Sequence, residues 1–321
     1  MHEAAQLSQK ICPDNNFLKK TVAPFSGVCN IISALHKERP FIRGNLFMKP
    51  GKLTVEAPLL VICGQEGSGK TTLAAEAVLE FGGVFIRTED GLQKYANKPE
   101  DEQPLAFPVL PKATPEKPEA FVNALYEALD WCWDNMEHGQ ILVIDTISVM
   151  FQRLQQTVLN RYGVSNVAEA AGGYGKGFLE IETETLRLID ELNALRSEKG
   201  VAVLLLCHQQ ADTIKNDPIV EAALCYNLAM DKKSAAVFKQ QAHAILAIGF
   251  DMVITGTETD KAGKVTKAGR IRKVSKRHLI CDASTPAYSQ LCKNRFDLPA
   301  KLELPEGDLS LFDSIKFFEG K

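Results

Sequence analysis

One stretch of the chain, Gly64-Gln65-Glu66-Gly67-Ser68-Gly69-Lys70-Thr71, matches the phosphate-binding loop pattern G-x-x-x-x-G-K-[ST] at every fixed position. Glycines allow the backbone to approach an anion closely, and the N–H groups at a helix N-terminus point at phosphate oxygens. Lys70 would reach the β- and γ-phosphates, and the Thr71 hydroxyl would ligate Mg²⁺. Together with Thr72, these residues form a predicted site for a nucleoside triphosphate.

The flanking residues must position this loop. Pro58–Cys63 is a short apolar run that predicts a fully buried strand, and Thr72–Leu79 carries apolar residues on one face of a predicted helix. A strand, a glycine loop and a helix in this order make an anion cradle. The alternative is a glycine-rich turn with a chance lysine, which the flanking elements disfavour.

Carboxylates follow two further predicted strands. Asp145 ends the strand Gln140–Asp145 after four apolar residues, as a Walker B aspartate does, and we expect it to support the metal. Glu89 and Asp90 end the strand Gly83–Thr88, where a carboxylate could orient the attacking water. The alternatives are that Asp145 caps a turn and that Glu89 and Asp90 are turn residues.

His208 and Gln209 follow the apolar strand Val201–Cys207 and are candidates to sense the γ-phosphate. An ordinary strand-end histidine is an equally good interpretation of His208. A metal-binding role for His208 is disfavoured because no second histidine or cysteine lies at ligand spacing. The chain has no N-K-x-D guanine motif, so we expect the nucleotide to be ATP.

Strand and helix patterns alternate from Lys52 onward, which predicts an α/β fold with a mainly parallel central sheet. Residues 121–136 and 178–196 have helical spacing, and short runs within 245–279 predict antiparallel strands at one edge of the sheet. About thirty residues after Asp145 have no clean period and are interpreted as a long functional loop, and 209–230 is also poorly patterned. We expect an N-terminal extension (1–51), an ATPase domain (52–304) and a C-terminal tail (305–321).

Composition narrows the class of protein. The hydrophobic fraction of 45% suits a soluble globular core, and no run approaches membrane-spanning length. The 8 cysteines form no C-x-x-C pair, which favours reduced thiols and a cytoplasmic location. A net charge of −3 means that nucleic-acid binding would depend on a local basic patch.

The order of these motifs resembles RecA/RadA-type ATPase cores. More closely, the chain resembles phage-encoded RecA-like proteins of single-strand annealing recombination, a likeness that covers about residues 53–304. The stretches that carry it are Gly64–Thr72, Val143–Ser148, Gly172–Gly177 and Lys293–Pro299. The resemblance implies that Glu89 activates water, that Gln209 or His208 is the γ-phosphate sensor, and that the loops after Asp145 and Gln209 contact DNA. Cys207-His208-Gln209 departs from the asparagine–glutamine pair of that pattern, which leaves the sensor open.

The resemblance also implies a homo-oligomer, a ring or a filament, in which Lys232 and Lys233 could reach a neighbour's phosphates. Independent support for DNA comes from a basic strip without acids, for which a solvated hairpin is the alternative. Its members are Lys261, Lys264, Lys267, Arg270, Arg272, Lys273, Lys276 and Arg277. Cations and aromatics that could stack single-stranded DNA lie in the first loop, at Arg153, Arg161, Tyr162, Tyr174 and Lys176.

These observations predict a DNA-stimulated ATPase that binds single-stranded DNA and promotes annealing or strand exchange in phage-type recombination. A single-strand-binding protein is a candidate partner, and no membrane partner is expected. Two alternatives stay open at this point. One is a hexameric DNA motor or helicase, and the other is a nucleotide-gated regulatory protein without a DNA role.

Overall fold

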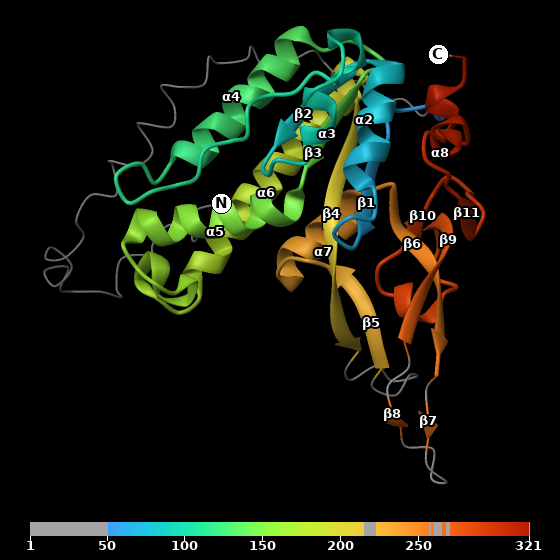
Figure 1. Ribbon diagram of the computed structural model, residues 1–321. Coiled ribbons are helices and arrows are strands. Elements are labelled where there is room, and N and C mark those ends of the chain that lie inside the picture. The colour runs from blue at the N-terminus through green and yellow to red at the C-terminus, as the bar shows by residue number, and fades with distance from the viewer. Residues whose placement is uncertain (1–50, 215–222, 257, 260–264, 268–269, 321) are drawn as a thin grey trace, which may run out of the picture. The chain divides into compact units, whose positions relative to one another are not determined.

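The computed structural model describes residues 51–214, 223–256, 258–259, 265–267 and 270–320 (Figure 1). For 251–254, 258–259, 265–267 and 271–275 the backbone alone is described. Thr54–Lys321 forms one compact unit. The predicted N-terminal extension, 1–51, lies almost entirely outside the described residues.

The core of this unit is a sheet in which five neighbouring strands run parallel, in the order β6-β1-β4-β3-β2. These strands are β1 (Leu59–Gly64), β2 (Gly83–Arg87), β3 (Ile141–Asp145), β4 (Ala202–Ile214) and β6 (Ala244–Thr255). Antiparallel strands follow at the β6 edge: β9 (Arg270–Ile280) pairs with β6, and β11 (Lys301–Glu303) pairs with β9. The short strand β10 (Lys293–Asn294) also pairs with β6, and β7 (Glu258–Thr259) pairs with β8 (Val265–Lys267). The predicted α/β fold class, with a mainly parallel central sheet and antiparallel strands at one edge, is confirmed.

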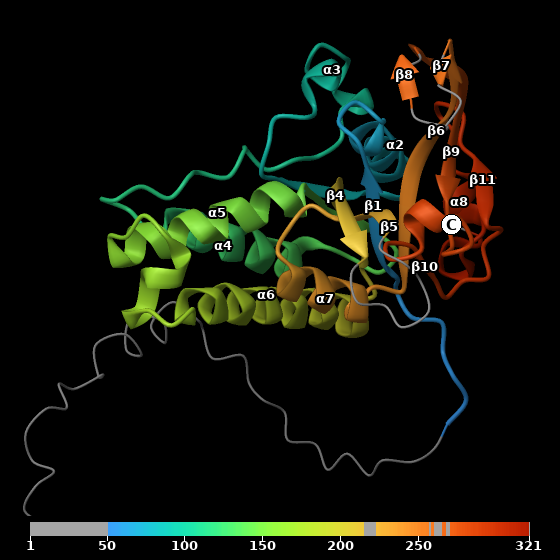
Figure 2. The same ribbon diagram turned by 90° about the horizontal axis from the view of Figure 1, so that it is seen from below.

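Helices cover both faces of the sheet (Figure 2). They are α2 (Lys70–Phe81), α3 (Gln93–Ala96), α4 (Ala120–Asn135), α5 (Ile147–Tyr162), α6 (Lys176–Ala194), α7 (Lys232–Gln241) and α8 (Ser310–Asp313). Alternate residues of a strand face opposite sides, so Leu59 and Val61 of β1 join the core beneath α4, α5 and α6, whereas Leu60 and Ile62 join the core beneath α2. Burial on both faces explains why the strands read as continuous apolar runs.

The interpretation of the residues after Asp145 as a long loop is wrong for Ile147–Tyr162, which form α5. The apolar residues of α5 recur at helical spacing and are buried: Ile147, Met150, Phe151, Leu154 and Val158. Thr146 caps the helix by accepting a hydrogen bond from the Val149 N–H at 3.4 Å, and Gly163 ends it at φ 61°. The helical spacing was present in the sequence, but the segment is rich in Gln, Arg and Asn, which favoured its interpretation as a loop.

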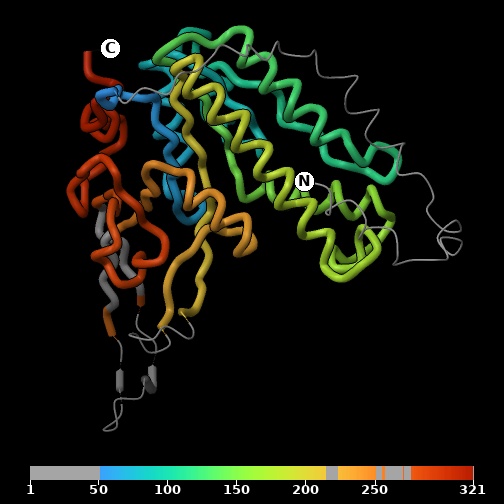
Figure 3. Tube along the Cα trace, turned by 180° about the vertical axis from the view of Figure 1, so that it is seen from behind, coloured from blue at the N-terminus to red at the C-terminus, as the bar shows by residue number. Residues whose placement is uncertain are grey.

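The poorly patterned segment after Gln209 contains strand structure. β4 continues to Ile214 and pairs antiparallel with β5 (Ala223–Leu228), while 215–222 lies outside the described residues. β1 ends opposite His208 of β4 and Ile248 of β6, so both of these strands run on past the phosphate loop. The tube in Figure 3 shows the β4–β5 pair extending beyond the end of β1, and Figure 1 shows the β6–β9 pair running in the same direction as the β4–β5 pair.

The segment after Leu304 packs against α2. Its buried apolar residues are Leu311, Phe312, Ile315, Phe317 and Phe318. The ring of Phe81, at the C-terminal end of α2, lies 5.8 Å from that of Phe312 and 4.9 Å from that of Phe318. These residues therefore belong to the same apolar core as the helix that begins at Lys70.

No helix in the described part of the chain is long and apolar enough to span a bilayer. The cysteines in the described ranges are free, and Cys63, Cys132, Cys207, Cys225 and Cys281 are buried. Burial raises the pKa of the Cys132 thiol to about 12 and that of Cys281 to about 11, which makes both unreactive at neutral pH.

Candidate functional site

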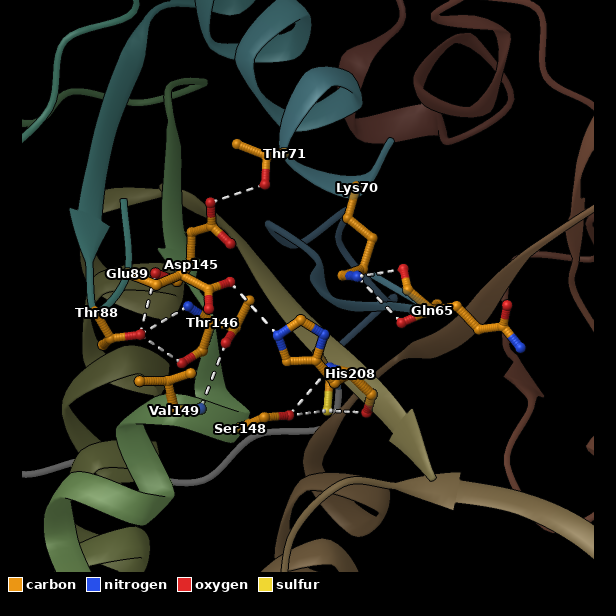
Figure 4. A network of polar contacts seen from close by, with 12 residues as sticks. Gln65, Lys70, Thr71, Thr88, Glu89, Asp145, Thr146, Ser148, Val149 and His208 are labelled. Carbon is orange, nitrogen blue, oxygen red and sulfur yellow. Dashed lines mark hydrogen bonds and ion pairs between the residues drawn. The ribbon is translucent and has the colours of Figure 1, made fainter. Parts of the chain in front are cut away.

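The phosphate loop joins β1 to α2 as the sequence predicts. Gly67 and Gly69 have φ values of 68° and 91°, in the left-handed region that glycine adopts without strain. Lys70 is 5% exposed, and its Nζ donates hydrogen bonds of 3.0 Å to the carbonyls of Gly64 and Gln65 (Figure 4). Burial lowers the pKa of Lys70, while the nearby carboxylate of Asp145 opposes the shift. The loop thus holds a desolvated cation at its centre.

Asp145 and Thr71 meet although β3, which ends at Asp145, is not a neighbour of β1, which leads into the phosphate loop and Thr71. β4 lies between β1 and β3, so Asp145 is at the end of a strand one step removed from the phosphate loop. The Thr71 Oγ1 nevertheless donates a 2.9 Å hydrogen bond to Asp145 Oδ2. A side chain at Gly91 would place its Cβ 3.0 Å from that carboxylate oxygen and 3.2 Å from Thr71 Oγ1, so it would press on the Thr71–Asp145 pair. Gly91 is a site residue that the sequence motifs did not reveal.

The Thr71–Asp145 pair fits a Mg²⁺ site. Asp145 is fully buried, and its Oδ1 has no hydrogen-bond partner among the described residues. Mg²⁺ is commonly held by one or two carboxylates together with a hydroxyl, waters and substrate phosphates. No cluster of three or more His, Cys, Asp or Glu side chains that could hold a metal occurs in the ranges described.

The same burial perturbs the acidity of Asp145. Desolvation raises its pKa to about 6, the hydrogen bond from Thr71 lowers it, and the negative charge of Glu89 raises it. A bound cation would favour the ionised form and reverse this shift. The carboxylate is therefore costly to keep charged until a cation binds it.

This cost leads to a stability prediction. In metal-free protein at about pH 7.5, Asp145→Asn is expected to raise the free energy of unfolding by about 2–3 kcal/mol. The folded chain binds the Asp145 proton more tightly than the unfolded chain, because its pKa rises from 3.8 to about 6. The stability that comes from this proton is fully present below pH 3.8, and it is lost as the pH rises through the folded-state pKa of about 6. Denaturant titrations of both proteins with a chelator, at a series of pH values, measure the difference. If the difference in unfolding free energy between the two proteins stays constant with pH, the raised pKa of Asp145 is contradicted.

Glu89 and His208 form a second pair at this edge of the sheet. Glu89 Oε1 lies 3.5 Å from His208 Nε2. The pKa of Glu89 is lowered, and the largest cause is its hydrogen bond with His208. Desolvation of the carboxylate acts in the opposite direction and raises the pKa. The backbone N–H of His208 donates to Ser148 Oγ at 3.0 Å, and this hydroxyl also lies 3.2 Å from Cys207 Sγ. The histidine backbone is therefore tied to the start of α5.

These groups line one cavity of about 450 Å³. Its walls are the residues Glu66–Thr72, together with Glu89, Asp90, Gly91 and His208. Gln209 is not among them, because successive strand residues face opposite sides; it instead hydrogen-bonds Tyr288. Of the two sensor candidates, the fold brings His208 to the phosphate loop.

Residues 57–295 match the family model described as an AAA domain (AAA_24). The chain belongs to this AAA-domain family. Among solved structures, it is similar to the crystal structure of the RadB recombinase, with 14% sequence identity and a TM-score of 0.40, over 78% of this chain and 90% of that one. No match was found among curated proteins. The family and the phosphate-loop core make this AAA-domain protein a nucleotide-binding P-loop ATPase.

Several residues of this AAA-domain protein that were predicted to contact DNA instead form hydrogen bonds within the protein. They are two of the three cations and one of the two aromatics. Arg153 donates to the carbonyls of Leu110, at 2.8 Å, and Thr88. Arg161 contacts both carboxylate oxygens of Glu119, at 2.7 and 2.9 Å, and Glu180 at 2.8 Å. The Tyr162 hydroxyl donates to Glu180. These contacts hold α5 against its neighbours. Tyr174 and Lys176, by contrast, are exposed.

The basic strip divides into parts. Lys261 and Lys264 lie outside the described residues, as do the side chains of Lys267, Arg272 and Lys273. Arg270 is exposed. Lys276 pairs with Glu303 at 2.8 Å, and Arg277 donates to the carbonyls of Leu304 and Pro305 at 2.9 and 3.0 Å. The final two cations therefore lie beside the C-terminal segment.

Two other expectations concern α7 and the Lys293–Pro299 motif. At the start of α7, Lys232 Nζ lies 4.0 Å from Asp212 Oδ2, and Lys233 Nζ lies 3.4 Å from Glu182 Oε2. Contact of these lysines with a neighbouring subunit stays a prediction. Lys293 Nζ donates to the last carbonyls of α7, those of Lys239 and Gln240. Asn294 accepts from the N–H groups of Phe296 and Leu298. The motif thus builds a turn and caps a helix.

Proposed function

We propose that this AAA-domain protein hydrolyses Mg²⁺-ATP and couples hydrolysis to single-stranded DNA in phage-type annealing or strand exchange. The observation that carries this proposal is a single cavity lined by Lys70, Thr71, Glu89 and His208. Asp145 adjoins it through the hydrogen bond that it accepts from Thr71. A cation for phosphates, a metal-ligand pair and a carboxylate for water are the groups that phosphoryl transfer needs. Their convergence supports hydrolysis rather than nucleotide binding alone.

The phosphate loop performs the binding. Backbone N–H groups of Gly67–Lys70 and the positive end of α2 face the phosphate oxygens, and the Lys70 ammonium neutralises charge beside the γ-phosphate. Thr71 Oγ1 and the unpartnered Asp145 Oδ1 would hold Mg²⁺, with Asp145 acting directly or through a water. When bound, Mg²⁺ would neutralise the negative charge that develops on the phosphates during transfer.

Glu89 is proposed to position the attacking water. Its lowered pKa keeps it ionised at neutral pH, so it can accept a hydrogen bond from water. His208 is proposed as the γ-phosphate sensor, because its ring contacts Glu89 and lines the same cavity. A γ-phosphate that draws the imidazole would alter the contact that holds Glu89. His208 also lies on the strand that continues into the β4–β5 hairpin, which offers a route from the nucleotide to a DNA-facing element.

The DNA proposal is supported by the Gly172–Lys176 turn. Tyr174 is fully exposed at φ 55°, between glycines that also have positive φ, and Lys176 begins α6 beside it. An exposed aromatic ring next to a cation can stack a base and contact its phosphate without reading sequence. Exposed Arg270 adds a cation at the outer end of the β6–β9 pair, opposite Thr255. A ring or filament, with Lys232 or Lys233 facing a neighbour's phosphates, and a single-strand-binding partner complete the proposal.

The ATPase rate with and without single-stranded DNA, at about 50 and 200 mM salt, tests the DNA coupling. We expect stimulation that weakens at the higher salt, because phosphate contacts release counterions. Tyr174→Ala is expected to abolish most of the stimulation and leave the DNA-free rate unchanged, whereas Tyr174→Phe retains the stacking ring and the stimulation.

Other outcomes favour the alternatives. Absence of stimulation together with salt-independent binding would favour a nucleotide-gated regulatory protein. Processive unwinding of a forked duplex would favour a DNA motor. Annealing of complementary strands without unwinding supports the proposed function.

A further inference from the structure

A second cavity, of about 600 Å³, lies on the other side of the phosphate loop. It shares Gly67, Ser68, Gly69 and Thr72 with the cavity that contains Glu89 and His208. Its remaining walls come from β6, β9 and the segment Glu303–Glu306. The loop therefore separates two spaces, and only one of them contains the residues proposed for hydrolysis.

Arg277 joins the far wall to the loop. It is the cross-strand partner of Phe250, so the two side chains emerge on the same face of the β6–β9 pair. A Cβ atom built on Gly69 would lie 2.2 Å from Arg277 Nη1, which shows that the guanidinium packs directly on the loop backbone. The other guanidinium nitrogens donate to the carbonyls of Leu304 and Pro305. One side chain thus ties the phosphate loop to the C-terminal segment.

The C-terminal wall is anchored at several points. The Leu304 N–H donates to the Arg277 carbonyl at 2.9 Å, and its side chain is fully buried. Beyond it, Phe312 and Phe318 pack on Phe81 of α2. Glu306 lies 3.5 Å from Lys94 of α3, in the segment that follows Glu89. The wall is therefore held to both ends of the helix that carries Lys70 and Thr71.

We propose that this second cavity holds the nucleoside of the bound triphosphate, and that Glu303–Glu306 is its outer wall. The inference rests on the proposed function, since it deepens the same site. A triphosphate held by the loop must extend its nucleoside away from the hydrolytic side, and this cavity adjoins the loop there. The Phe250 ring and Pro305 offer apolar surfaces for a base. Glu303 and Glu306 can accept hydrogen bonds from ribose hydroxyls, and Lys276 and Arg277 add positive charge beside the phosphates.

Titration calorimetry with Mg²⁺-ATP and with Mg²⁺-tripolyphosphate separates the two cavities. Tripolyphosphate has the phosphates without the nucleoside. Phe250→Ala is expected to weaken ATP binding about tenfold and to change tripolyphosphate binding by less than about twofold. The matched control is Phe178→Ala, which removes a partly exposed phenylalanine from α6 and should change neither affinity.

Lys70→Ala distinguishes this inference from the proposed function, because it should weaken both ligands. Wild-type affinity of that variant for both ligands would overturn the proposed function. An unchanged ATP affinity in Phe250→Ala, or equal loss of both ligands, would overturn the assignment of the second cavity. Hydrogen exchange on the unaltered protein adds an independent readout. ATP should slow exchange in peptides covering Glu303–Asp308 more than tripolyphosphate does, and equal protection would contradict the proposal.

Discussion

Replacing Lys70 with alanine is expected to abolish ATP hydrolysis, with a loss of at least about 10³-fold in rate, while the fold stays intact. The ammonium is buried in the phosphate loop and is directed at its carbonyls, where it would meet phosphate oxygens. A cation fixed in a desolvated site stabilises the transition state far more than an exposed one. Removal of a partly desolvated charge should cost little folding free energy, because burial already lowers the pKa of Lys70.

Steady-state phosphate release and thermal unfolding of the same sample measure both effects. Lys98→Ala is the matched control: this exposed lysine pairs with Glu102 at 3.0 Å, away from the cavity, and its loss should leave the rate unchanged. Turnover at the wild-type rate in Lys70→Ala would exclude the assigned phosphate site.

Replacing Glu89 with glutamine is expected to lower hydrolysis by about 10²–10⁴-fold and to preserve ATP binding. The amide keeps the size of the side chain, but it is a far weaker acceptor for a proton from water. Binding should persist because the phosphate contacts come from the loop and from Lys70, not from Glu89. Single-turnover hydrolysis and a fluorescent-nucleotide titration separate the chemical step from affinity.

Asp90→Asn provides the comparison for this variant. Asp90 lines the same cavity, but it hydrogen-bonds Arg87 at 3.3 Å and Gln93 at 2.6 Å. Its loss should reduce the rate by less than about tenfold. A larger effect at Asp90 than at Glu89 would transfer the water-positioning role to the neighbouring residue.

Much of the hydrolytic site could be predicted because its parts are local. The strand, glycine loop and helix around Lys70 are contiguous, and the Asp145, Glu89 and His208 positions each follow an apolar strand. The α5 helix was missed although Met150, Leu154 and Val158 are buried at helical spacing, because polar residues separate them. Residues with cationic or aromatic chemistry were assigned to DNA from type alone, yet Arg153 and Arg161 are held by carbonyls and carboxylates.

The sequence by itself determined the phosphate loop, the alternation of strands and helices, and the set of polar residues at the strand ends, because each depends on neighbours along the chain. Only the tertiary structure decided which of these residues meet. The pairing of Gly64 with His208 across β1 and β4 places His208, and not Gln209, in the cavity beside the phosphate loop. The antiparallel pairing of β9 with β6, together with the hydrogen bond from Arg277 to the Leu304 carbonyl, holds the Arg277 guanidinium against Gly69. Such contacts depend on sheet register and on packing between distant segments, which no local pattern encodes.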